Sequence, residues 1–307
     1  MEVITIGHAS IDLVKSRNTW VKQLGGAAIY TAMAAKIFSD TGVVSRVGMD
    51  FSPGFYSILR DAGVDTYGLK KVRGKSTTFK IEYDEAGIAS YGAYELNVGV
   101  HIRPEDIPNS YLRADAFHLA PMAASKQGRF IQFLRKKTMA KISMNTHIGY
   151  FSKYRREILK LIPRVDVFAL NDEEAKALTR TKSLSHALKA FKKKRHNLII
   201  ITTGPGASVI LENGETSISH TQYQTRVVDL TGCGDAYAGA FISSLLHAKD
   251  PIKSANIANS VASIAAMDWN LQAIKNLEFI SLSAFQEYVV ARQRRHRKKQ
   301  RSIEHFL

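Results

Sequence analysis

The chain has 307 residues, of which 45% are hydrophobic, so it can bury a large core as one domain or two. Its 43 basic residues exceed its 27 acidic ones, a formal charge of +16, and its single cysteine excludes an internal disulfide and favours a reducing compartment. No run approaches the ~18 apolar residues of a membrane helix, and the polar-apolar alternation of the first residues is unlike a signal peptide. We therefore expect a globular protein of the cytoplasm.

Short apolar runs rich in β-forming residues alternate with segments of helical spacing through most of the chain. The predicted strands cover residues 3–6, 116–119, 141–144, 165–170 and 198–202, and the predicted helices cover 126–137, 155–162, 173–178 and 185–193. This alternation predicts an α/β fold with a mainly parallel sheet flanked by helices. The segment 209–212 then meets Asn213-Gly214, a strong two-residue hairpin signal, so an antiparallel pair should close that region.

One segment, 76–91, has period-two alternation instead. Phe79, Ile81 and Tyr83 fall on one face, a turn is predicted at 84–87, and the chain returns over 88–91. A small antiparallel ribbon of this kind needs a cover, which a bound substrate or a second subunit could supply.

Residues 229–235 carry the clearest chemistry. They read Asp-Leu-Thr-Gly-Cys-Gly-Asp and join a predicted strand at 225–228 to a predicted helix at 236–247. Gly232 and Gly234 let backbone amides, including that of Cys233, converge at the positive end of the helix dipole, where they can hold a transferred phosphoryl group. Asp235 could accept the proton of an attacking hydroxyl. The alternative is an ordinary helix cap, because Asp and Gly are both common there.

The order of these residues resembles the second signature of the ribokinase-like, or pfkB-type, carbohydrate kinases, with Leu230, Cys233 and Tyr237 replacing residues usual in that family. The resemblance covers about residues 3–267. It implies a three-layer α/β/α domain spanning 1–307, with a small β-sheet lid from about 12–24 and 72–98. It also implies transfer of the γ-phosphoryl group of ATP, with Mg²⁺, to a small sugar, polyol or nucleoside, and a homodimer through the lid.

The resemblance also places residues on the acceptor side. Gly25-Gly26, followed by small residues and a helix, resembles the family's first signature, where the backbone approaches the substrate closely. Tyr30 stands where many members have Asn. Asp12, after the first strand, resembles the Asp that binds substrate hydroxyls, and its alternative is a turn residue.

On the nucleotide side, Asn171 and Glu174 resemble the family's Asn-x-x-Glu motif. Glu174 would act through water on a phosphate-bound Mg²⁺, with Asn171 near the phosphates. The alternative is a helix cap with acids in its first turn.

Two further matches concern the nucleotide itself. Thr202, Gly204 and Gly206 resemble a loop beside the nucleotide, although Ala207 stands where a final glycine is usual. Asn259, in a predicted helix at 252–267, matches a position lining the adenine pocket, with a buried and satisfied amide as its alternative.

The acceptor stays open. Parts of 24–28 and 75–79 look like myo-inositol kinases, while other members of similar length phosphorylate nucleosides. A different class is a non-catalytic nucleic-acid-binding protein on a kinase scaffold, because the run 292–301 in the tail 292–307 holds 7 basic residues and no acid. The intact Asp235 and its glycines argue against it, as do the missing zinc spacing and interleaved aromatics. A solvated helix end is the simpler interpretation of the tail.

Overall fold

The computed structural model describes residues 1–16, 19–83, 89–193, 197–204, 206–220 and 227–304. The strands of its central sheet are β1 (Val3–Ile6), β4 (Thr41–Val47), β5 (Val64–Asp65), β6 (Leu69–Lys71), β9 (Ala116–Leu119), β10 (Lys141–Asn145), β11 (Val167–Asn171), β12 (Leu198–Thr202), β13 (Ala207–Glu212) and β14 (Glu215–His220). They are ordered β14-β13-β12-β11-β10-β9-β1-β4-β5, and β6 also pairs with β4.

The pairs from β12 through β5 are parallel, whereas β13 is antiparallel to both β12 and β14. The prediction of a mainly parallel sheet is therefore confirmed, and so is the hairpin at Asn213-Gly214. Both hairpin residues have positive φ, 50° and 84°, which Asn and Gly tolerate best.

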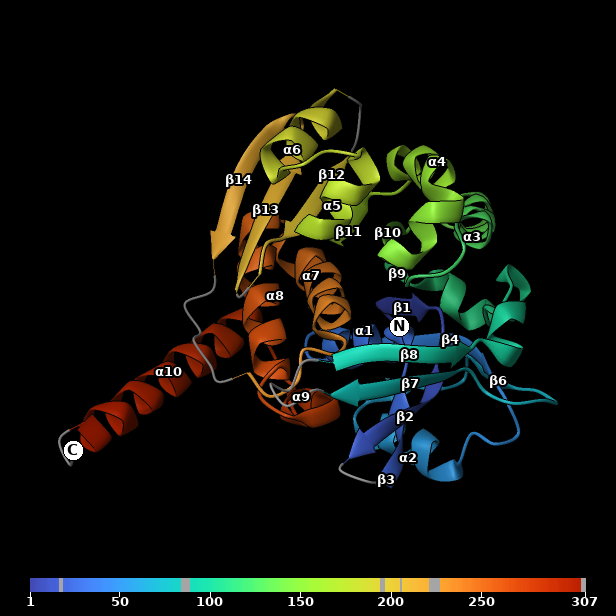
Figure 1. Cartoon of the computed structure of the whole chain (residues 1–307), viewed down its shortest axis with the longest axis horizontal. Coiled ribbons are helices and arrows are strands. Elements are labelled where there is room, and N and C mark those ends of the chain that lie inside the picture. Colours follow the sequence, from blue (N-terminus) through green and yellow to red (C-terminus); the bar gives the residue numbers. More distant parts are fainter. Residues whose placement is uncertain (17–18, 84–88, 194–196, 205, 221–226, 305–307) are drawn as a thin grey trace.

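Helices cover both faces of this sheet (Figure 1). The α-helices are α1 (Ala27–Ala35), α2 (Pro53–Asp61), α3 (Ala124–Lys137), α4 (Phe151–Leu161), α5 (Asp172–Thr179), α6 (Leu184–Lys192), α7 (Cys233–Ala248), α8 (Pro251–Ala265), α9 (Gln272–Lys275) and α10 (Leu282–Glu304). Short 3₁₀ helices are η1 (Asn97–His101), η2 (Pro104–Asp106), η3 (Asn109–Arg113), η4 (Ile148–Tyr150), η5 (Ile162–Arg164) and η6 (Trp269–Leu271).

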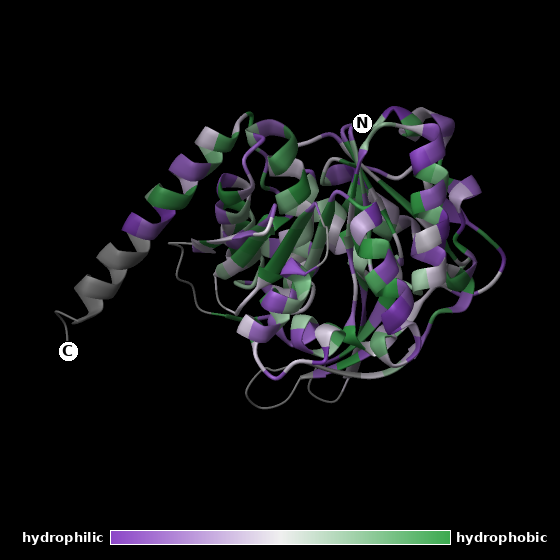
Figure 2. Cartoon of the chain, turned by 90° about the horizontal axis from the view of Figure 1, so that it is seen from above, coloured by the Kyte–Doolittle hydropathy of each residue, from purple (hydrophilic) through white to green (hydrophobic). Residues whose placement is uncertain are grey.

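Two hydrophobic cores separate the layers. One lies between the sheet and helices α1, α7 and α8, and the other lies between the sheet and helices α3 to α6. Alternate residues of each inner strand enter opposite cores: Ala116 of β9 faces the first, and Phe117 and Leu119 face the second. Figure 2 shows these hydrophobic strands enclosed between the two helical layers.

A second, smaller sheet has the order β3-β2-β7-β8 and lies beside the β1–β4 part of the central sheet (Figure 1). Its strands are β2 (Ser10–Ser16), β3 (Thr19–Gly25), β7 (Thr78–Tyr83) and β8 (Ala89–Glu95). The antiparallel ribbon predicted at 76–91 is thus confirmed as β7 and β8, with the return strand running further than predicted. The predicted turn at 84–87 lies outside the described residues.

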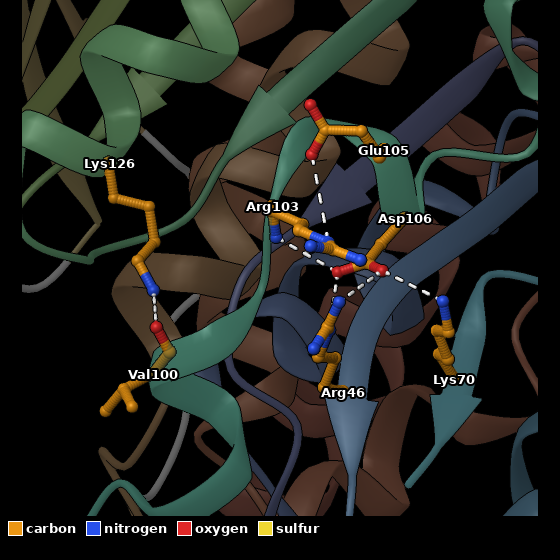
Figure 3. Close-up of polar contacts among 7 residues, drawn as sticks. All are labelled: Arg46, Lys70, Val100, Arg103, Glu105, Asp106 and Lys126. Carbon is orange, nitrogen blue, oxygen red and sulfur yellow. Dashed lines mark hydrogen bonds and ion pairs between the residues drawn. The ribbon is translucent and has the colours of Figure 1, made fainter.

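The chain that leaves β8 is fastened to the central domain by the contacts drawn in Figure 3. Asp106 of η2 accepts two hydrogen bonds from Arg46 of β4, at 2.7 Å to Oδ2 and 2.9 Å to Oδ1, and Lys70 Nζ lies 3.4 Å from the same Oδ1. Lys126 of α3 donates to the carbonyl of Val100 in η1. The segment that follows β8 therefore contacts both the central sheet, through β4, and a helix that covers it, α3.

One predicted strand is wrong. Residues 225–226 of the predicted strand 225–228 lie outside the described residues, and Val227 and Val228 are not in a strand. The amides of Val228 and Asp229 instead donate to the carbonyl of Ala266, at 2.7 and 3.2 Å. The end of α8 therefore takes the backbone partners that a neighbouring strand would have taken.

The last helix, α10, is anchored at one end and extends away from the body at the other (Figures 1 and 2). Leu282, Phe285 and Val289 are buried against the core that contains α7 and α8. Among the described residues, no helix is long and apolar enough to cross a membrane.

Candidate active site

The glycine turn at the start of α7 brings several predicted site residues together. Gly232 is the N-cap of this helix and has a left-handed backbone, with φ 72°. A β-carbon at Gly232 would lie 2.4 Å from the Tyr30 ring, so only glycine fits. Nothing lies within 4 Å of the position that a β-carbon of Gly234 would take. The turn is thus closed below by Tyr30 and open beside Gly234.

Asp235 lies in the first turn of α7, because the helix begins at Cys233, three residues before the predicted start. Its side chain does not cap the helix. Its Oδ1 accepts a hydrogen bond of 2.8 Å from Nδ2 of Asn145, at the end of β10. Burial raises the pKa of Asp235 to about 6, although the bond from Asn145 opposes that rise. A carboxylate of this kind is ionised at neutral pH and can accept a proton.

Cys233 is the first residue of α7 and belongs to the glycine turn. Burial raises the pKa of its thiol to about 12, with the charges of Asp229 and Asp235 adding to the rise. The Cys233 amide donates to Leu230 O, 3.2 Å away, and is therefore engaged within the turn. Of the amides predicted to hold a phosphoryl group, those of Gly234 and Asp235 remain the better candidates.

Glu174 of α5 is the second buried acid here. The capping box expected as the alternative is present: the Glu174 amide donates to Asn171 Oδ1 at 2.8 Å, and the Asn171 amide donates to Glu174 Oε2 at 3.0 Å. Burial raises the pKa of Glu174 to about 7, and the charge of Asp235 adds to that rise. The cap therefore holds the buried carboxylate of Glu174 near enough to Asp235 for their charges to interact.

These oxygen groups suit a hard divalent cation. Within the described residues, no three His, Cys, Asp or Glu side chains gather as a metal cluster. Mg²⁺ needs no such cluster, because it keeps several waters and binds one or two carboxylates together with substrate phosphates. Glu174 beside Asp235 fits that mode, since a cation would relieve the repulsion between the two acids.

A separate group lies at the base of the small sheet. Asp12 of β2 is buried, and its Oδ1 accepts a hydrogen bond of 2.6 Å from the hydroxyl of Ser10. Burial raises the pKa of Asp12 to about 6, and the Ser10 bond acts in the opposite direction. Gly25 faces this carboxylate. Gly26, with φ 100°, is the N-cap of α1, and a β-carbon there would lie 2.3 Å from the carbonyl oxygen of His8. The glycine pair is thus explained by close approach of the backbone to Asp12 and to the end of β1.

Tyr30 of α1 packs against the glycine turn. Its ring lies against Gly232, and its hydroxyl donates to Asn270 Oδ1 at 3.2 Å. The backbone N–H of Asn270 in turn donates to Asp229 Oδ2 at 3.4 Å. Tyr30 therefore supports the glycine turn, and direct contact of its side chain with substrate stays a prediction.

The predicted nucleotide residues lie along the ends of β11 to β13. Thr202 pairs with Asn171 in the parallel register, and the loop that follows contains Gly204 and Gly206 with φ of 96° and 73°. Asn259 of α8 is buried, and its Nδ2 donates to the hydroxyls of two serines on β13 and β14, at 3.2 and 3.0 Å. Its amide is thus satisfied, as the alternative interpretation expected, and a role in binding adenine stays a prediction.

Sequence reasoning missed Asn145. The strand was predicted to end at Met144, whereas β10 includes Asn145. A polar residue at the carboxyl end of a buried parallel strand was the available signal, because ligands bind at that edge of such sheets.

The family model described as pfkB family carbohydrate kinase matches residues 2–275. The cytidine kinase of Thermococcus kodakarensis is 26% identical over 249 residues, covering 79% of this chain and 88% of the relative.

Two solved structures share the fold. The adenosine kinase of Sinorhizobium meliloti superposes with a TM-score of 0.79 at 20% identity, covering 94% of this chain and 98% of that one. A fructokinase of Xylella fastidiosa with bound ATP superposes with a TM-score of 0.77 at 19% identity, covering 93% and 98%.

Proposed function

This chain belongs to the pfkB family of carbohydrate kinases, which are phosphotransferases acting on hydroxyl groups, and we propose that it transfers the γ-phosphoryl group of ATP to a small sugar, polyol or nucleoside. The observation that carries the proposal is the position of Asp235. It lies in the first turn of α7, directly after the glycine turn, with its carboxylate held by Asn145.

In the proposed reaction, Asp235 accepts the proton of the acceptor hydroxyl as that oxygen attacks the γ-phosphorus. The bond between the γ-phosphorus and the bridging oxygen then breaks, and ADP leaves. The amides of Gly234 and Asp235, at the positive end of α7, stabilise charge on the phosphoryl oxygens. Phosphoryl transfer depends mainly on positioning and electrostatics, so a carboxylate is a sufficient base.

Mg²⁺, when bound with ATP, would neutralise charge on the phosphates, and Glu174 is the residue proposed to hold it through water. Asn171 and the loop containing Gly204 and Gly206 lie on the same side, at the ends of β11 and β12. We assign the ATP phosphates to that side. The opposite side, with Asp12 and the Gly25-Gly26 pair, is assigned to the acceptor.

The small sheet is proposed to act as a lid over the acceptor. Asp12 belongs to β2, a strand of that sheet, so the acceptor would lie between the lid and the ends of the central strands. Closure would exclude water that otherwise hydrolyses ATP.

The lid is also the proposed site of a homodimer. Trp20, Val21 and Tyr94 of this sheet are 45%, 48% and 63% exposed. Exposed apolar side chains of this kind can be covered by a second copy. Sedimentation equilibrium of the wild type and of Trp20→Ser would test this assignment, since loss of the indole should weaken association.

The acceptor is tested by a turnover screen with ATP, Mg²⁺ and a panel of nucleosides, pentoses, hexoses and inositols. Nucleosides come first because two of the compared proteins are named as nucleoside kinases; myo-inositol remains an alternative. ADP release that depends on one acceptor class, and is lost in Asp235→Asn, supports the proposal. Salt-sensitive binding of nucleic acid without any turnover would favour the non-catalytic alternative.

A further inference from the structure

A polar stripe runs through the core beneath the glycine turn. His118 of β9 lies opposite Ser143 of β10, and Asn145 is two residues further along the same strand. The three side chains share the face of the sheet that carries α7, while their neighbours Ile142 and Met144 enter the other core. All three are at most 7% exposed. Burying such groups is costly unless each is hydrogen-bonded. The hydrogen bonds of these three side chains therefore indicate which group each of them orients.

The bonds of His118 have one consistent direction. Its Nε2 lies 3.2 Å from Asn145 Oδ1, and its Nδ1 lies 3.0 Å from the Ser143 hydroxyl. An amide oxygen only accepts, so the Nε2 of His118 must carry hydrogen and donate to it. Nδ1 then accepts from Ser143. Burial lowers the pKa of His118 to about 4, so the ring is neutral at neutral pH and holds this single tautomer.

The amide of Asn145 passes this direction on. With its oxygen held by His118, its NH₂ group faces Asp235 and donates to Oδ1 at 2.8 Å. The main chain of Asn145 is held as well, because Gln127 Nε2 of α3 donates to its carbonyl at 2.9 Å. A carboxylate accepts only, so an amide turned the other way would place two oxygens against each other.

We propose that Asn145 is a positioning residue for phosphoryl transfer, and that His118 and Ser143 fix the direction of its amide. This inference rests on the proposed function of Asp235 as the base. Asn145 holds one carboxylate oxygen so that the other faces the acceptor hydroxyl. The neighbouring ionisable groups are Glu174 of α5 and Cys233 of α7 itself, and neither donates to Asp235 through a side-chain bond within the described residues.

Four variants test the proposal. Asn145→Ala removes the donor, and His118→Leu removes the group that orients it. His118→Gln keeps an N–H donor at about the position of Nε2. Met144→Leu is the matched control, because this residue lies beside Asn145 on the same strand and enters the opposite core.

We expect Asn145→Ala and His118→Leu to lower kcat by about 10- to 100-fold, the worth of one hydrogen bond to a charged group. The KM for ATP should stay within about twofold, because the side chains assigned to ATP, those of Asn171 and Glu174, are unchanged in these variants. The acid limb of the pH profile should move upward by about one pH unit, because the lost donor favoured the ionised carboxylate. His118→Gln should recover most of the activity, and Met144→Leu should behave as wild type.

Nuclear magnetic resonance of the wild type separates this inference from the proposed function. The ¹⁵N shifts of His118 should report hydrogen on Nε2, and the side-chain NH₂ of Asn145 should shift as Asp235 titrates. We call the chain of hydrogen bonds from Ser143 through His118 and Asn145 to Asp235 the relay. These signals in a protein without kinase turnover would support the relay while removing the proposed function. Hydrogen on Nδ1 of His118, or equal losses in His118→Gln and His118→Leu, would overturn the relay even in an active kinase. Both readouts stand if Asn145→Ala fails to fold.

Discussion

The carboxylate of Asp12 occupies the space into which a side chain at Gly25 would point. A β-carbon built on Gly25 would lie 1.9 Å from Oδ2 of Asp12, far inside any possible contact. Any other residue at position 25 must therefore displace the carboxylate. Gly25→Ala thus moves Asp12 without changing its chemistry.

We expect Gly25→Ala and Asp12→Ala to share one kinetic effect. Each should raise the KM of the acceptor by about one to two orders of magnitude, as expected for losing a hydrogen bond of ~1.5–3 kcal/mol to a charged group. The KM of ATP should scarcely change. Gly54→Ala is the control, because the nearest atom to its β-carbon would lie 3.7 Å away. A raised KM for ATP with an unchanged KM for the acceptor would show that the site is oriented the other way.

Asp235→Asn should keep the shape of the side chain but remove its ability to accept a proton. We expect kcat to fall by about 10²–10⁴, the usual contribution of a positioned base. Calorimetric titration with ATP should give nearly the wild-type affinity. A variant that keeps more than about half of wild-type turnover would remove Asp235 from the mechanism.

The pH dependence should report Asp235 together with the two other buried acids of the site. Burial places the pKa of Asp235 at about 6, and a base must be ionised to act. The acceptor kcat/KM, which reports the free enzyme, should therefore be level above about pH 8 and fall about tenfold or more per unit below pH 6, because Asp12 and Glu174, with pKa values of about 6 and about 7, lose their charge over the same range. Stopped assays across buffers of constant ionic strength would measure this limb. An acid limb near pH 4 would mean that the carboxylate is not buried as described.

Asp106→Asn should destabilise the fold. Burial alone would raise the pKa of Asp106, but the bonds from Arg46 and from the Arg103 amide hold it below its ordinary value. Its contribution is thus present above the unfolded pKa of ~3.9 and is lost as the pH falls through the lower folded pKa. Breaking a buried pair costs about 3–5 kcal/mol, so urea unfolding at pH 7 should show a loss of that order.

The Asp106 experiment has a matched control and a pH test. Glu105 lies next in the chain, but its side chain is 67% exposed and its Oε2 lies 3.9 Å from Arg103 Nε. Glu105→Gln should therefore change stability by less than about 1 kcal/mol. The difference between Asp106→Asn and wild type should shrink below about pH 4. A constant difference down to acid pH would mean that packing, not charge, is responsible.

Truncation before Arg292 should leave catalysis nearly unchanged. The retained part of α10 keeps Leu282, Phe285 and Val289, which bury the helix against the core. The removed part carries the whole basic run 292–301 and lies beyond every proposed site residue. Turnover and thermal unfolding of the truncated protein measure the effect. A folded but inactive truncation would assign the tail to the kinase, whereas weaker binding to polyanions alone would not.

Three inner strands could be predicted with their bounds because their signals are local. The ranges 3–6, 116–119 and 198–202 match β1, β9 and β12 residue for residue, since each is a short run buried on both faces. The strand at 225–228 failed because the partner of Val228 is Ala266, which local propensity cannot reveal.

The same limit applies to the site. The glycine turn and Asp235 are contiguous in the chain, so their pattern could be recognised. The bond from Asn145 joins residues 90 positions apart, and the bond from His118 to Asn145 joins residues 27 apart. Periodicity indicates which face a residue takes, but a hydrogen-bond partner on another strand or helix depends on the assembled fold.

The place of Asp12 in β2 has a thermodynamic consequence. The same strand pairs with β7, and the Ile11 amide donates to Thr77 O at 2.8 Å, so the carboxylate proposed to bind the acceptor is part of the sheet proposed to close over it. Binding an acceptor and holding the sheet closed then become one coupled equilibrium. A ligand that binds the closed form has a lower apparent affinity when a smaller fraction of the molecules is closed. Substitutions far out on β7 or β8 can therefore change which acceptors the protein retains without contacting any of them.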